Sequence, residues 1–180
     1  MSLLRPDWAA IAQARDPVVH LWLRIALPHS AGVGLAFYLG SAFFNRDWHP
    51  VWGYSTSAAD ALRVGLGAFL IAAAAPLVLA AVMQRLAHMY RQQPDYAAAF
   101  RVAVHAARPL WLAGLTLFLM PMFVLGMLAA LVSLAQCGAG ASALLDIKQD
   151  ESTEFVGISI LAFAIVLSLG GMMVSSLRLL

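Results

Sequence analysis

Two ionisable side chains, Arg24 and His29, lie inside the first long apolar stretch of the sequence. A charge at the bilayer centre costs about 2.5–3.5 kcal/mol on insertion scales, so such residues often mark a functional site. With a helix rise of about 1.5 Å per residue from Val18, Arg24 lies about 9 Å deep and can reach back to the surface, whereas His29 lies about 16 Å deep. Pro28 removes the helical donor to the Arg24 carbonyl, and a neutral histidine can donate to such a carbonyl on another helix.

Two interpretations of this pair stay open. Arg24 and His29 either form a polar pocket or proton path, or His29 is a packed interior residue with one hydrogen bond. A proton relay needs further ionisable partners, and no Asp or Glu falls at membrane depth in any predicted span. The packed residue is therefore the favoured interpretation.

A second group of basic side chains shares one helical face. Arg101, His105 and Arg108 follow at i, i+4 and i+7, so they fall on one side of a helix. This basic face could dock anionic lipid head groups, or it could pair with an acidic loop further along the chain. The acids of that loop are Asp146, Asp150, Glu151 and Glu154. The simpler interpretation, a solvated helix start on the cytoplasmic side, is favoured.

The sequence holds little that could do catalysis. It has no GxSxG, HExxH or phosphate-binding glycine loop. The single cysteine, Cys137, excludes an internal disulfide, and the five histidines lack metal-ligand spacing. We therefore expect no catalytic residue, no metal and no cofactor. A net charge of +2 without a basic stripe also argues against nucleic-acid binding.

The elements that carry these residues must be membrane helices. Hydrophobic residues make up 62 % of the 180-residue chain and charged residues only 11 %. A soluble domain is about half apolar and about a quarter charged. The low charge and the aromatic content exclude a disordered chain. The composition therefore predicts an all-α, polytopic integral membrane protein.

Apolar segments of sufficient length divide the chain into five predicted spans. They cover residues 18–44, 58–87, 97–120, 122–145 and 155–177, after an N-terminal interfacial segment, residues 1–17, which Trp8 anchors. The 37 residues from 109 to 145 carry no charge, and we interpret them as a hairpin that turns at Pro121. One long kinked helix is the alternative.

Arginine placement predicts the orientation, because cytoplasmic flanks carry the excess of basic residues. With the N-terminus inside, eight basic residues lie on the inner side and three on the outer side. The N-terminus is therefore expected in the cytoplasm and the C-terminus outside. Ten of the eleven basic residues are Arg, and Ala and Leu are abundant, which suggests a bacterial plasma-membrane protein.

Small residues at four-residue spacing predict close helix packing. They are Gly32, Ala36 and Gly40 in the first span, and Gly171 and Ser175 in the fifth. Small side chains let helix backbones approach closely. The expected contacts lie inside the bundle, and a homodimer seam is the alternative.

Several short motifs resemble the Yip family, the Ypt/Rab-interacting membrane proteins, in its bacterial branch. They are Pro6, Trp8, Arg15, Ala26-Leu27-Pro28, Gly40-Ser41, the stretch 108–114 (RPLWLAG) and the stretch after Pro121. The resemblance implies five spans, a cytoplasmic N-terminus and a compact helical bundle. Eukaryotic members of the family are linked to small GTPases and vesicle traffic, which bacteria lack. This sequence has Ala135-Gln136-Cys137-Gly138 where the family pattern has Tyr and Gly-Leu-Pro, so no functional residue is carried over.

We therefore expect a non-enzymatic scaffold, interaction or membrane-organising protein. Its expected partners are the lipid bilayer and anionic head groups, together with a protein partner or a second copy of the chain. A small transporter or channel with a polar path near Arg24 and His29 is the alternative. A lipid-modifying enzyme would need converging nucleophile, base or metal ligands, and the sequence offers none.

Overall fold

The structure is a computed structural model that describes residues 6–44, 58–116 and 123–176. This part of the chain consists of helices and their connections and contains no strand, which confirms the all-α prediction. The elements are α1 (Trp8–Ala14), α2 (Val18–Leu21), the π-helical η1 (Trp22–Ala26), α3 (Leu27–Leu39), the π-helical η2 (Gly40–Phe44), α4 (Ala58–Ala87), the 3-10 helix η3 (His88–Tyr90), α5 (Tyr96–Ala106), α6 (Arg108–Gly114), α7 (Phe123–Leu144) and α8 (Ser152–Ser176).

The short helix α1 is set by local sequence at both ends. The Asp7 carboxylate accepts a hydrogen bond from the Ala10 backbone N–H at 3.1 Å and so caps the free donors of the first turn. Arg15 ends the helix in the left-handed conformation, with φ of 44°. Pro17 then precedes α2 in extended conformation, so α1 and α2 cannot run on as one helix.

Residues 18–44 form a helix that widens twice into π turns. At η1 the Leu27 N–H donates to the Trp22 carbonyl, five residues back. The widened turn precedes Pro28, whose ring would crowd the carbonyl four residues before it in a regular helix. Proline is therefore accommodated by a local change of helix type.

The long helix α4 contains Pro76 near its middle. Two side chains from neighbouring elements donate to carbonyls beside this proline. The Trp22 indole donates to the Ala73 carbonyl at 3.0 Å, and the Tyr96 hydroxyl donates to the Leu77 carbonyl at 3.0 Å. These bonds tie η1 and the start of α5 to the same turns of α4.

The predicted third segment begins as a capped helix. The Asp95 carboxylate accepts a hydrogen bond from the Ala98 N–H at 2.6 Å. The helix is interrupted at Ala107, between α5 and α6, next to Pro109, which has no N–H to donate. Every residue from Ala98 to Ala106 is buried, so α5 is the central helix of the bundle.

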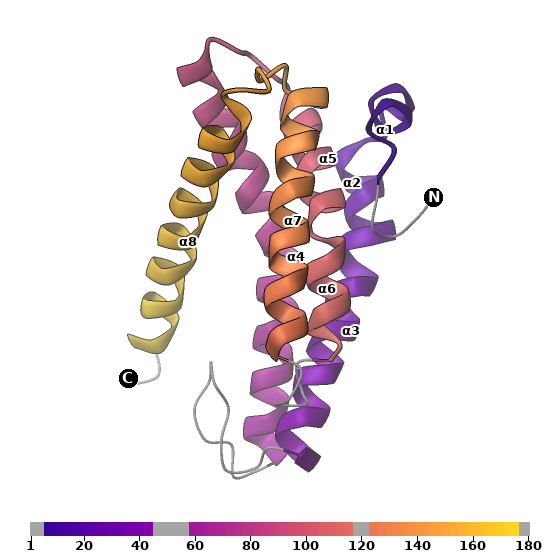
Figure 1. The fold of residues 1–180 in the computed structure, drawn as a ribbon. Helices are drawn as coiled ribbons and strands as arrows, with labels where there is room; N and C mark the ends of the chain where they lie inside the picture. The colour runs from indigo at the N-terminus through magenta and orange to yellow at the C-terminus, as the bar shows by residue number, and fades with distance from the viewer. Residues whose placement is uncertain (1–5, 45–57, 117–122, 177–180) are drawn as a thin grey trace.

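Both α5 and α6 pack along α7, and Figure 1 shows α6 and α7 side by side. The alternative of one long kinked helix over residues 97–145 is therefore wrong. The predicted corner at Pro121 lies outside the described residues. Beyond α7, α8 contacts α4 and α7 and leans away from the bundle toward its C-terminal end (Figure 1).

The outside of the bundle is apolar. Leu66, Leu70, Leu131 and Leu161 are each more than half exposed. Two helices, Ala59–Tyr90 and Val124–Leu144, are long and apolar enough to cross a membrane. Two helices of the described residues pass this test, so the arrangement of five spans stays a prediction.

Candidate anion-binding cavity

The basic face of α5 points into the protein. Arg101 is only 8 % exposed and His105 only 5 %, and Arg108 is half-buried. The favoured interpretation, a solvated helix start, is therefore wrong. Periodicity places these side chains on one face correctly, but α5 is surrounded, so that face meets other helices and not water.

These basic side chains line a cavity of about 400 Å³ beneath α1. We call it the basic cavity. Its lining residues belong to α1, to the connection between α1 and α2, and to the helices α2, η1, α5 and α6. The ionisable residues that line it are Asp16, His20, Arg24, Arg101, His105 and Arg108.

Positive charge is in excess at the basic cavity. Three arginines stand against one aspartate, which leaves an excess of two charges with both histidines neutral. In the part of the chain that the structure describes, the ion pairs are Arg63–Asp60 and Lys148–Glu151, and both lie elsewhere. The arginines of the cavity therefore have no carboxylate bound to them.

Two buried side-chain nitrogen atoms of the residues that line the cavity also lack partners. Nε of Arg101 donates to the Ala97 carbonyl at 3.2 Å, whereas Nη1 is buried without a hydrogen bond. Nδ1 of His105 is likewise buried and unpaired. Most buried polar groups in proteins have a hydrogen-bond partner. The unpaired groups therefore identify this cavity as the strongest candidate site in the described structure.

The helix α1 is held over the cavity by Trp8. The Trp8 ring meets the His105 ring edge-on, with centroids 6.4 Å apart. It also fills the space beside Gly140 on α7, where an added Cβ would lie 2.8 Å from Cη2 of Trp8. The sequence suggests that Trp8 is a membrane anchor, but its indole packs against the protein. This contact depends on the absence of a side chain at Gly140.

Arg24 and His29 have different surroundings. Arg24 lines the basic cavity, and His29 is not among its lining residues. Nδ1 of His29 donates to the Ile25 carbonyl at 2.7 Å, and its ring lies 5.4 Å from that of Trp111. This hydrogen bond runs to Ile25, one turn back on the same helix, and not to a carbonyl of another helix. The structure gives no support to a polar path that joins the two residues.

The acidic loop lies apart from the basic cavity. None of its four acids lines that cavity. Lys148 pairs with Glu151 at 3.9 Å inside the loop. Phe155 packs edge-on against Tyr90 with centroids 5.4 Å apart. The loop is therefore tied to η3. Asp146 and Asp150 are exposed.

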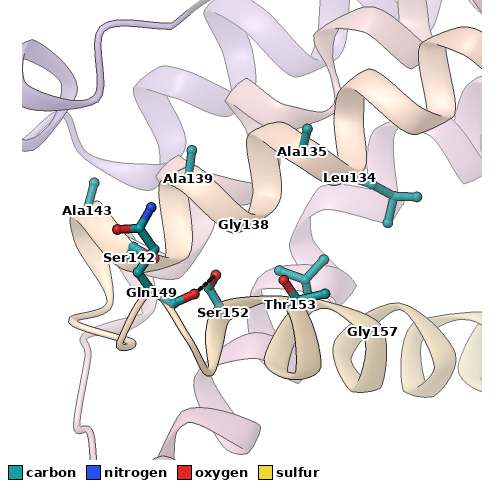
Figure 2. A pocket seen from close by; sticks show the side chains of 11 residues that line it. Leu134, Ala135, Gly138, Ala139, Ser142, Ala143, Gln149, Ser152, Thr153 and Gly157 are labelled. Carbon is teal, nitrogen blue, oxygen red and sulfur yellow. Dashed lines mark hydrogen bonds between the residues drawn. The ribbon is translucent and has the colours of Figure 1, made fainter.

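A larger cavity of about 800 Å³ lies between α7 and α8, and the sequence analysis missed it. Figure 2 shows it lined mainly by small side chains, including Ala135, Ala139 and Gly157. The Ser152 hydroxyl donates to the Gln149 carbonyl at 2.8 Å at one end. No charged side chain lines it. The sequence does indicate this cavity, because alanine recurs at every fourth position of α7, at residues 135, 139 and 143.

Of the predicted packing residues, Ala36 and Gly40 are buried. A Cβ at Gly32 would lie 2.9 Å from Cδ2 of Leu115, so Gly32 faces the segment that follows α6. Gly171 and Ser175 belong to α8, and their packing stays a prediction. Among the residues that the structure describes, no three His, Cys, Asp or Glu side chains are grouped so that they could hold a metal ion.

Comparison with known families gives one match. A family model described as the Yip1 domain matches residues 2–172, which is almost the whole chain. No curated protein and no solved structure matches the chain.

Proposed function

The chain belongs to the Yip1-domain family, and on that premise we propose that it is a five-span membrane scaffold, an interaction or membrane-organising protein without enzymatic activity. We place it in a bacterial plasma membrane with its N-terminus in the cytoplasm. The proposed partners are the anionic lipids of the inner leaflet and another protein, which includes a second copy of this chain.

One observation carries this proposal. The helix α1, the connection between α4 and α5, and the connection between α7 and α8 gather at one end of the bundle (Figure 1). Exposed charged side chains concentrate there. They include Arg15, Arg85, Arg91, Asp146, Lys148 and Asp150. We call this end the charged end.

The charged end has the properties of a surface that meets partners from the cytoplasm. Its charges are of both signs and are mostly unpaired, so they are available to another molecule. The flank of the bundle is apolar by contrast and suits contact with lipid. More basic residues lie toward the charged end than toward the opposite end, which is the pattern of a cytoplasmic side.

Site-specific photo-crosslinking tests the scaffold role. A photoreactive amino acid replaces Arg91 or Lys148 at the charged end, in the full-length protein at native abundance. The matched control replaces Arg63, an equally exposed arginine near the other end of α4. We expect a discrete adduct from positions 91 and 148 and none from 63. An adduct of twice the monomer mass identifies a second copy, and any other adduct is identified by peptide mass spectrometry.

Absence of an adduct at both charged-end positions contradicts the scaffold role. Equal adducts at position 63 contradict it too, because they show no preference for the charged end. The orientation is tested separately with Arg63→Cys and Lys148→Cys in a Cys137→Ser background. We expect a membrane-impermeant maleimide to label position 63 in intact cells and position 148 only after permeabilisation. The reverse pattern overturns the orientation.

A further inference from the structure

We propose that the basic cavity binds the phosphate group of an anionic ligand, with the lining residues Arg24, Arg101, His105 and Arg108 as its binding groups. This inference concerns a ligand site inside the fold. It stands whether or not the charged end recruits a protein partner.

Arg101 is buried although it carries a charge. A guanidinium stays charged at every pH that a protein tolerates. Removal of a charge from water is costly unless hydrogen bonds and an opposite charge replace the water. Arg101 is 92 % buried, since 8 % of its surface is exposed, and Nη1 has no partner. A bound anion supplies both the missing acceptor and the missing charge.

Further polar groups from separate elements converge on the same space. Nδ1 of His105, which is only 5 % exposed, is a second buried group without a partner in the lining. Arg24 comes from η1 and Arg108 from α6, so separate elements bring positive charge to one cavity. Asp16 is the one carboxylate in the lining, and it cannot neutralise three arginines.

The shape and the place of the cavity favour phosphate over a larger or weaker anion. Guanidinium groups present several N–H donors in a planar fork that matches phosphate oxygens. A volume of about 400 Å³ admits a phosphate with a small attached group. Arg24 lies six residues after Val18, about 9 Å along the helix, a depth from which its side chain can reach back to the head-group level of a bilayer.

The phosphate can come from a phospholipid head group or from a soluble phosphate, and two measurements distinguish these sources. In the first, the full-length protein is exchanged into nanodiscs of phosphatidylcholine with or without phosphatidylglycerol, and native mass spectrometry counts the phospholipids it retains. In the second, inorganic phosphate is titrated by calorimetry in detergent without phospholipid, with chloride at matched ionic strength as reference. The variants are Arg101→Gln and Arg24→Gln.

Arg63→Gln is the matched control. Arg63 is an exposed arginine near the other end of α4, away from the charged end, and it does not line the cavity. Its replacement removes the same charge without touching the site. Arg24 is exposed, so its variant keeps the test valid if Arg101→Gln does not fold.

We expect the wild-type protein to retain phosphatidylglycerol over phosphatidylcholine, and Arg101→Gln to weaken retention about tenfold or more, as expected for loss of a charged hydrogen bond. Arg24→Gln weakens it several-fold, and Arg63→Gln leaves it unchanged. Binding of inorganic phosphate with the same variant pattern, without lipid preference, assigns the site to a soluble phosphate. The proposal is overturned if neither phosphate source binds, if both cavity variants bind like the wild type, or if Arg63→Gln weakens binding as much as Arg24→Gln does.

Discussion

Gly34 on α3 and Gly65 on α4 face each other with no room for a side chain on either. A Cβ on Gly34 would lie 2.8 Å from the Gly65 carbonyl oxygen, and a Cβ on Gly65 would lie 2.9 Å from the Gly34 carbonyl oxygen. Each added carbon would also meet the Cβ of a large side chain, Phe69 or Tyr38, at 2.7 Å. Glycine at both positions lets the two backbones come into direct contact, as small residues do in membrane bundles.

Gly34→Ala and Gly65→Ala should each lower the stability of the protein. The clash is with backbone and with Cβ atoms, which cannot rotate away, so we expect a loss of about 1–3 kcal/mol. Gly138→Ala is the control, because a Cβ there meets nothing within 4 Å. It should leave stability unchanged or raise it by up to about 1 kcal/mol, since alanine favours the helix. Thermal unfolding in one detergent measures all three, and equal stability of Gly34→Ala and Gly138→Ala would contradict the close contact.

Gly140→Val should release α1 from the bundle. The new side chain would collide with Trp8 and with Cγ1 of Val102, the latter at 2.9 Å from the Cβ position. We expect hydrogen exchange of the α1 amides to accelerate about tenfold or more, which corresponds to about 1.4 kcal/mol of lost local stability. Gly138→Val carries the same β-branched residue on the same helix, in open space. If the α1 amides exchange at the same rate in both variants, Trp8 does not hold α1 in place.

Arg91→Gly should stabilise the protein. Arg91 ends η3 with φ of 60°, a left-handed conformation that costs a residue with a Cβ about 1–2 kcal/mol. Glycine removes that cost but has more freedom in the unfolded chain, so we expect a net gain of about 0.5–1 kcal/mol. The same change at Arg85, an exposed residue inside α4, should instead cost about 1 kcal/mol. If Arg91→Gly is less stable than the wild type, the contacts of the Arg91 side chain contribute more stability than its left-handed backbone costs.

Tyr96→Phe and Trp22→Phe should each remove one hydrogen bond to the carbonyls beside Pro76. The acceptors are the Leu77 and Ala73 carbonyls, each at 3.0 Å. We expect each variant to lose about 0.5–1.5 kcal/mol, with an additional packing loss for the smaller ring at position 22. The acceptors differ, so the double variant should lose the sum to within about 0.5 kcal/mol. Thermal unfolding of the single and double variants checks this, and a double variant no worse than either single one contradicts independent bonds.

Local sequence determined the helical character of the chain and several of its boundaries. Asp7 and Asp95 lie just before helices and cap them, and Pro17 separates α1 from α2. These features depend on residues within about one turn of each other, so they can be read without knowledge of the partners. Composition likewise predicted a membrane protein with no strand.

Only the tertiary structure decided what each helix face meets. Periodicity placed Arg101, His105 and Arg108 on one face, but burial under α1 turned that face into a cavity lining. Arg24 joined them from a segment almost eighty residues earlier. The sequence marked Gly32 as a packing residue, and Gly34 beside it is the residue that meets the backbone of α4, at Gly65. The helical repeat determines which residues share a side, and the rotation of neighbouring helices determines what lies opposite, because that rotation follows from the packing of all the helices together.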